Sequence, residues 1–152
     1  MRGSERVRAA FRDDRVALIP YLTGGYPTLE GAWEVGEAYV EAGADVLEIG
    51  VPFSDPLADG PTTQDTATRA LENGADLDYC LELAGGFSGR VPVVLGFGIG
   101  SVEAATQAAK EADGVIIGSK LMRLVGEGGP ERAGGWLREV REALSDVARV
   151  GG

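Results

Sequence analysis

The chain has 152 residues, of which 44 % are hydrophobic and 25 % charged, and this composition is typical of a single globular domain. The net charge of −10 is opposite in sign to a nucleic-acid-binding surface, and no apolar run approaches the roughly 20 residues of a membrane span. Histidine is absent and Cys80 is the single cysteine, which excludes histidine-based catalysis, an internal disulfide and a multi-cysteine zinc site.

The first 14 residues are charged and lack the apolar stretch of a signal peptide, so we expect a cytoplasmic protein with no membrane partner and no nucleic-acid partner. Downstream, short apolar runs end in glycine-containing turns and are followed by helical patterns. The runs predict strands at 16–23, 46–50, 91–95 and 113–117. The helices are predicted from Thr28 to Gly43, at 62–71, from Asp76 to about Ala84, from Ser101 to about Ala112, and after Pro130, with 85–90 as a connection.

The order of these elements indicates the fold class. Strands that alternate with helices are typical of βα units and a parallel sheet. Each predicted strand is apolar at successive positions, as expected when both faces of the sheet are covered. A closed eight-stranded barrel needs about 250 residues, so the length alone favours a smaller, flavodoxin-like doubly wound sheet. Trp33, Tyr39 and Trp136 are interpreted as core residues because their spacing follows the helical period. Cys80, within LDYCLEL, is interpreted as a packing residue because no neighbouring residue would lower its pKa.

Glu48 is a carboxylate within an otherwise apolar strand, VLEIG. By strand alternation Val46, Glu48 and Gly50 share one face, while Leu47 and Ile49 take the other. Burial would raise the pKa of Glu48 toward the range useful for general acid or base catalysis. The alternative interpretation, in which Glu48 pairs with an arginine, has equal weight from the residues alone.

Further candidate residues lie in the turns after the strands. Asp59 follows the strand of Glu48; such an Asp is more often a turn or cap residue, but two nearby carboxylates can divide acid and base roles. The glycine turns 96–98 and 118–119 each follow a strand and precede a helix. Glycine lets backbone N–H groups approach an anion at a helix N-terminus, so the pair predicts a phosphate site, the alternative being two tight turns.

Four segments resemble the tryptophan synthase alpha subunit family, namely PYLTGGYP, GADVLEIGVPFSDPLADGPTTQ, LGFGIGS and ADGVIIGS. The resemblance covers most of the chain, and LEIGVPFSDPLADGP is its most specific run. It implies a TIM barrel and a lyase of tryptophan biosynthesis that cleaves indole-3-glycerol phosphate to indole and glyceraldehyde 3-phosphate in a retro-aldol reaction. It also implies that this reaction needs no cofactor and that the indole passes to a PLP-dependent beta subunit.

The resemblance implies roles for single residues of the matching motifs. Glu48 is implied to be the acid/base that moves the proton at the indole C3, and Asp59 the carboxylate that holds and polarises the indole N–H. Tyr21 is implied to line the indole pocket. Three residues are implied to bind the phosphate group: Gly98, Gly118 and Ser119. Three others are implied to form the loop that communicates with the beta subunit: Pro52, Asp55 and Pro56.

The number of units departs from the family. A complete barrel has eight βα units, whereas this sequence predicts four, which match units 1–2 and 7–8. We therefore interpret residues 1–152 as one half-barrel domain, a partial (β/α)8 TIM barrel, with an internal junction near 85–96. In a closed barrel the last strand neighbours the first, so the expected strand order is 7-8-1-2, with the candidate residues on one rim.

A half barrel would expose two sheet edges and an apolar inner face, and two copies could cover them by closing on each other as a homodimer. The alternatives to a lyase are a non-catalytic half barrel that binds phosphate or the beta subunit, and a fragment without a stable fold.

Overall fold

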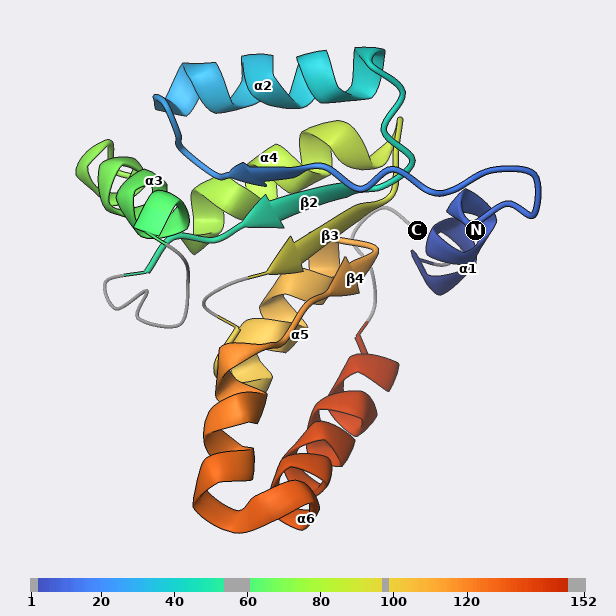
Figure 1. The fold of residues 1–152 in the computed structure, drawn as a ribbon, viewed down its shortest axis with the longest axis vertical. Helices are drawn as coiled ribbons and strands as arrows, with labels where there is room; N and C mark the ends of the chain where they lie inside the picture. Colours follow the sequence, from blue (N-terminus) through green and yellow to red (C-terminus); the bar gives the residue numbers. More distant parts are fainter. Residues whose placement is uncertain (1–2, 54–60, 97–98, 148–152) are drawn as a thin grey trace.

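The computed structural model describes residues 3–53, 61–96 and 99–147. These residues form a four-stranded parallel sheet with helices before, between and after its strands (Figure 1). The strands are β1 (Tyr21–Thr23), β2 (Leu47–Gly50), β3 (Val93–Gly96) and β4 (Gly114–Val115). The helices are α1 (Gly3–Ala10), α2 (Leu29–Glu41), α3 (Pro61–Glu72), α4 (Leu77–Ser88), α5 (Val102–Glu111) and α6 (Ser119–Ser145). Within the described ranges, no helix combines the length and the apolar character that a membrane crossing requires.

The sheet has the order β1-β2-β3-β4, and all neighbouring strands are parallel. The expected order, in which the last strand lies beside the first, is therefore wrong, because β1 and β4 form opposite edges. The physical reason is the connection through α4. A helical crossover packs back onto the sheet and returns the chain to a strand position beside the strand it left, so β3 pairs with β2. The four predicted βα units are confirmed, and they are consecutive in space.

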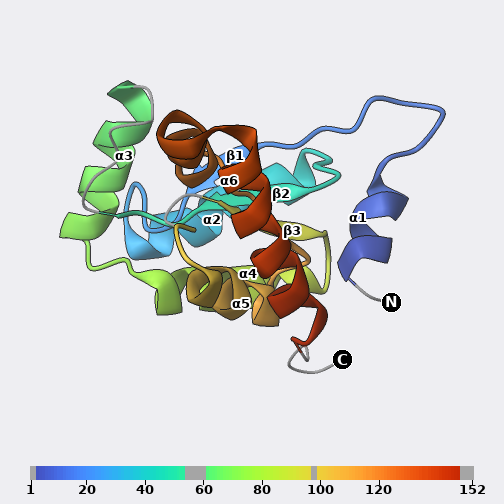
Figure 2. The same cartoon turned by 90° about the horizontal axis from the view of Figure 1, so that it is seen from below.

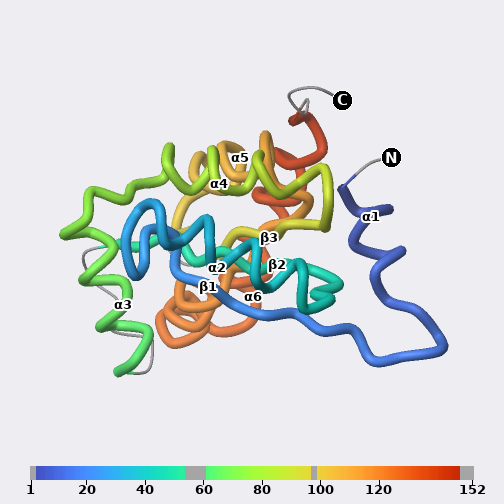
Figure 3. Tube along the Cα trace, turned by 90° about the horizontal axis from the view of Figure 1, so that it is seen from above, coloured from blue at the N-terminus to red at the C-terminus, as the bar shows by residue number. Residues whose placement is uncertain are grey.

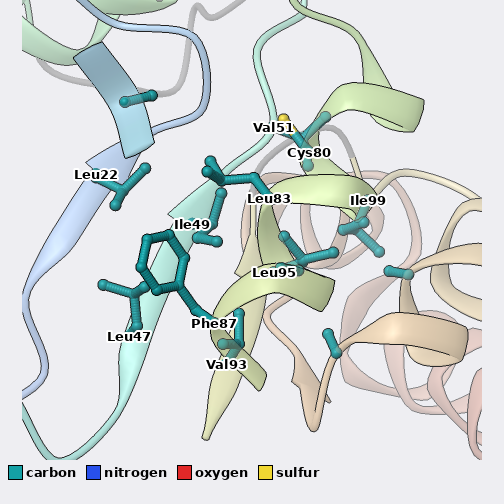
Figure 4. Close-up of a cluster of buried hydrophobic side chains, with 14 of the residues drawn as sticks. Leu22, Leu47, Ile49, Val51, Cys80, Leu83, Phe87, Val93, Leu95 and Ile99 are labelled. Atoms are coloured by element: carbon teal, nitrogen blue, oxygen red, sulfur yellow. The ribbon is translucent and has the colours of Figure 1, made fainter. Parts of the chain in front are cut away.

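The hydrophobic core lies between one face of the sheet and the helices α2, α4 and α5. Leu47 and Ile49 of β2 are fully buried on this face, where the α4 side chains Leu83 and Phe87 reach them (Figure 4). The helices α4 and α5 lie side by side over the same face (Figure 2). Cys80 belongs to this core, which confirms its interpretation as a packing residue.

The other face of the sheet carries Tyr21, Glu48 and Val94, and we call it the open face. These three side chains are only partly buried. The expectation that both faces are covered is thus wrong for the described residues, and so is the doubly wound sheet that the length alone favoured. In this fold the helices gather on one side because each right-handed βα crossover lies on the same side as the one before it.

The helix starts follow the predicted capping residues. Thr28, Asp76 and Ser101 each accept a hydrogen bond from the backbone N–H three residues later, which satisfies a donor that the helix leaves unpaired. Two predicted elements have wrong bounds: of the strand predicted at 16–23 only Tyr21–Thr23 is formed, and α4 ends later than predicted. The helix α4 continues to Ser88 instead of ending near Ala84, because Phe87 is buried in the core. The helix predicted after Pro130 is confirmed as the second half of α6, because Gly128 and Gly129 are not helical; the first half, which begins at Ser119, was not predicted.

Two buried aspartates hold the N-terminal segment at the end of the sheet where the strands begin. Asp45, just before β2, accepts a hydrogen bond from the backbone N–H of Leu18 at 2.8 Å and forms an ion pair with Arg15. Asp113, just before β4, has the same kind of partners. The two aspartates occupy equivalent places in GADVLEIG and EADGVIIG. The helix α1 lies at the side of the molecule away from α3 (Figure 3), and neither it nor these contacts follow from the hydrophobic pattern.

Asp113 is expected to stabilise the fold more than its partly exposed partner Arg6 does. Its side chain is fully buried and accepts from the backbone N–H of Val93 at 2.9 Å and from Arg6 Nη1 at 3.0 Å. Asp113→Ala leaves the N–H of Val93 without this acceptor, so we expect it to lower the free energy of unfolding by about 2–3 kcal/mol. Arg6→Ala should cost less, because Asp113 keeps its hydrogen bond from the N–H of Val93.

Urea unfolding of both variants measures this difference. Arg12→Ala is the control, because Arg12 and Asp14 form an ion pair with both side chains exposed. Equal stabilities of Asp113→Ala and Arg12→Ala would show that the buried carboxylate contributes nothing.

Candidate active site

A row of residues crosses the open face at the first or second position of each strand. Tyr21 of β1 is opposite Glu48 of β2, Glu48 is opposite Val94 of β3, and Val94 is opposite Gly114 of β4. Strand alternation explains the row, since Leu47 and Ile49 on either side of Glu48 are fully buried in the core. Glu48 and Tyr21 therefore project on the same side of the sheet, as neighbours.

The carboxylate of Glu48 lies over β3. A Cβ placed on Gly96 would come within 3.3 Å of Glu48 Oε1 and within 3.4 Å of the Ile116 side chain. Glycine at this position thus makes room for the carboxylate beside an apolar side chain. Partial burial withdraws the carboxylate from water and raises the pKa of Glu48 above its ordinary value. Among the described residues, the five ion pairs do not include Glu48, so the pairing with an arginine has no support in this part of the chain.

Tyr21 leans along the sheet toward the carboxyl end of β2. Its hydroxyl occupies the space where a Cβ on Gly50 would project. The hydroxyl also lies 3.0 Å from Thr23 Oγ1, which in turn lies 2.8 Å from Thr66 Oγ1 of α3. This chain of hydroxyls joins β1 to α3 and positions the tyrosine ring.

Thr23 and Thr66 were not singled out from the sequence. Alternation along β1 places Thr23 on the face of Tyr21, and this signal could have identified it. Thr66 carries no comparable signal, because its contact depends on how α3 packs against β1.

The other predicted site residues that the structure describes lie at the carboxyl edge of the sheet, where the strands end. Pro52 is buried directly after β2, and Ser119 begins α6. Gly118 is the N-cap residue of α6, and its carbonyl accepts the N–H of Met122 at 3.1 Å. Because the strands are parallel, these positions lie at the carboxyl edge of the sheet, the edge at which α/β proteins bind ligands. Asp55, Pro56, Asp59 and Gly98 lie outside the described residues.

The described residues supply acid/base and hydrogen-bonding groups rather than metal ligands. In that part of the chain, no three His, Cys, Asp or Glu side chains gather in a way that could hold a metal ion. The Cys80 thiol is buried away from the open face, and burial raises its pKa to about 12, so it stays protonated. The chemistry that the described arrangement offers is proton transfer by Glu48.

Comparison with protein families assigns the chain to one family. The family model described as tryptophan synthase alpha chain matches residues 7–90 and 87–148. The chain belongs to the tryptophan synthase alpha chain family.

Individual relatives agree with this membership of the tryptophan synthase alpha chain family. The tryptophan synthase alpha chain of Xanthomonas campestris pv. campestris is 42 % identical over 130 residues, which are 76 % of this chain and 48 % of the relative. That of Xanthomonas oryzae pv. oryzae is 55 % identical over 84 residues, covering 53 % of this chain and 31 % of the relative. The chain thus spans about half the length of the curated relatives it matches.

Solved structures show the same fold. Tryptophan synthase subunit alpha from Legionella pneumophila superposes with a TM-score of 0.56 at 21 % identity, covering 97 % of this chain and 100 % of that chain. A ligand-free tryptophan synthase from M. tuberculosis gives a TM-score of 0.52 at 22 % identity, covering 94 % and 98 %. These likenesses establish the fold as part of a TIM barrel, as the motifs had predicted.

Proposed function

We propose that this chain carries the reaction implied by its family, the retro-aldol cleavage of indole-3-glycerol phosphate to indole and glyceraldehyde 3-phosphate. The observation that carries the proposal is the position of Glu48. Its half-buried carboxyl has a raised pKa and lies beside Tyr21 at the carboxyl edge of the open face. A carboxyl that stays protonated at a higher pH than usual suits general acid catalysis.

In this proposal Glu48 supplies the proton that the indole C3 gains. The bond between C3 and the glycerol carbon breaks and its electrons restore the aromatic indole. The hydroxyl on the departing carbon gives its proton to the Glu48 carboxylate as the aldehyde forms, which restores the acid. Asp59 is proposed to hold and polarise the indole N–H, and Tyr21 to line the indole pocket. The hydroxyls of Thr23 and Thr66 would keep Tyr21 in place.

The remaining site residues are proposed to bind the phosphate group and a partner. The start of α6 at Gly118 and Ser119, together with Gly98, would bind the phosphate group through backbone N–H groups at helix N-termini. The loop with Pro52, Asp55 and Pro56 would contact a tryptophan synthase beta subunit, which would receive the indole. No cofactor takes part in this proposed step.

We also propose a single half-barrel domain with a junction near 85–96, located in the cytoplasm and assembled as a homodimer. The junction is supported by the family match, whose two segments meet at 87–90. The homodimer is supported by the two sheet edges at β1 and β4, neither of which has a second strand partner among the described residues.

Indole release from indole-3-glycerol phosphate by the purified chain tests the reaction. It is measured with and without a beta subunit, and we expect release in both cases. A cooperatively folded chain that releases no indole in either case would contradict the lyase.

A second function follows from the length of the chain. Because it spans about half of its curated relatives, we propose as the alternative a non-catalytic half barrel that binds phosphate or the beta subunit. Isothermal titration with glycerol phosphate, and separately with the beta subunit, distinguishes it, since this alternative predicts binding without indole release.

A further inference from the structure

The two edge strands of the sheet are complementary. Among the described residues, β1 pairs only with β2 and β4 only with β3. All four strands are parallel, so a rotation of one copy by half a turn about the barrel axis keeps the strand direction. Such a rotation would place β4 of each copy beside β1 of the other, and a symmetric pair of interfaces would close eight strands.

The edge at β1 has a hollow that the residues of β1 themselves help to line. A pocket of about 240 Å³ lies between α2, β1 and α3. Its wall contains Val35 and Tyr39 of α2, Thr62 and Thr66 of α3, and Tyr26 from the turn after β1. The next strand and helix around a closed barrel would pack against this position.

The edge at β4 presents apolar side chains. Met122 and Val125 in the first half of α6, the helix that follows β4, are 67 % and 40 % exposed. These side chains offer the apolar surface that the hollow beside β1 would accept.

The charges of the two edges also differ in sign. The helix α2 contains four glutamates and no lysine or arginine. The first turns of α6, residues 119–126, contain Lys120 and Arg123 and no acidic residue. Complementary charge favours the contact of these two helices and disfavours contacts of α2 with itself.

The exposed area of the chain is large for its size. It exposes 8619 Å², whereas a folded monomer of 15.8 kDa exposes about 7,300 Å². The excess of roughly 1,300 Å² is more than the approximately 800 Å² that each partner buries in a standard interface. The exposed area thus leaves room for an interface of standard size.

We propose that two copies of this chain close an eight-stranded barrel, with β4 and the first half of α6 of each copy seated against β1 and α2 of the other. The open faces of both copies, each with its Glu48, then line one shared interior. This interface specifies the contacts of the homodimer proposed above. It does not depend on the proposed reaction, so a dimer that releases no indole would leave the interface proposal intact.

Sedimentation velocity measures the mass in solution. We expect the wild-type chain to have twice the mass of the 15.8-kDa chain. The double variant Met122→Asp, Val125→Asp is expected to be a monomer with the same circular dichroism spectrum, because both side chains are exposed within one copy. Gln107→Asp on α5 adds a charge to an exposed position between the edges, and it should remain a dimer.

Three outcomes would overturn the interface. A monomeric wild type would exclude the dimer, and a dimeric double variant would place the contact elsewhere. A monomer that associates only with an added beta subunit would assign the edges to that partner.

Zero-length carbodiimide cross-linking maps the contact. The chain has only two lysines, Lys110 and Lys120. In a mixture of ¹⁵N-labelled and unlabelled protein, we expect Lys120 to join Glu34 or Glu41 of α2 in peptides that combine both isotopes. Links of Lys120 to α2 confined to single copies, or links of Lys110 to α2 between copies, would contradict the proposed arrangement.

Discussion

Glu48→Gln is expected to lower indole release from indole-3-glycerol phosphate by about 100-fold or more, the usual contribution of a general acid or base. The amide keeps the size of the side chain above Gly96 but cannot donate the proton that the indole C3 gains. Steady-state kinetics should therefore show the loss in kcat, with a smaller change in KM. The measurement uses the same concentration of chain and of beta subunit for both proteins.

Glu82→Gln is the matched control for this substitution. It removes one carboxylate from an exposed position of α4, on the side of the sheet away from Glu48. We expect it to leave indole release unchanged. Equal rates for Glu48→Gln and Glu82→Gln would assign the proton transfer to another group.

The stability of Glu48→Gln is expected to change in the opposite direction to its activity. Desolvation raises the pKa of Glu48 in the folded chain, so the folded state binds this proton up to a higher pH than the unfolded state does. The wild type therefore loses stability as the pH rises from the ordinary glutamate pKa through the raised pKa. The amide cannot ionise and does not show this loss.

Urea unfolding at about pH 4 and about pH 8 brackets this window. We expect the stability of Glu48→Gln relative to the wild type to be higher at the upper pH than at the lower. A relative stability that is the same at both pH values would show that Glu48 ionises as easily in the folded chain as in the unfolded one.

Phe87→Ala is expected to lower the free energy of unfolding by about 3–5 kcal/mol, which is a large part of the stability of a small domain. Phe87 is 1 % exposed, and its ring lies 5.5 Å from the ring of Trp33, centroid to centroid. Its ring packs over Gly36 so closely that a Cβ there would lie 2.5 Å from it. Removing the ring leaves a cavity between α2 and α4, because Gly36 has no side chain that could fill it.

Ser88→Ala is the neighbouring control. The Ser88 hydroxyl donates a hydrogen bond to the carbonyl of Gly85 on its own helix, and its loss should cost about 1 kcal/mol or less. Labelling of Cys80 with a thiol reagent reports opening of the same core, because its thiol is buried. We expect Phe87→Ala to speed labelling strongly and Ser88→Ala to change it little. Equal effects of the two substitutions would contradict the contribution of the buried Phe87 ring to the core.

Part of the candidate site could be read from the sequence because it depends on local rules. Alternation along VLEIG places Glu48 opposite the core-facing Leu47 and Ile49, and the structure has this arrangement. The raised pKa of Glu48 also follows from a carboxylate in an apolar strand. The roles of Tyr21, Gly118 and Ser119 depended on a resemblance of motifs, and their catalytic and binding functions stay predictions.

By itself the sequence determined the family, the four strand-helix units and the residues that begin three helices. These properties depend on side chains close together in the chain, such as Thr28, Asp76 and Ser101 at their helix starts. Only the tertiary structure decided the strand order, the burial of Asp113 against Arg6, and the continuation of α4 to Ser88. Each depends on residues far apart in the chain, because pairing, ion pairs and core packing act between elements that folding brings together.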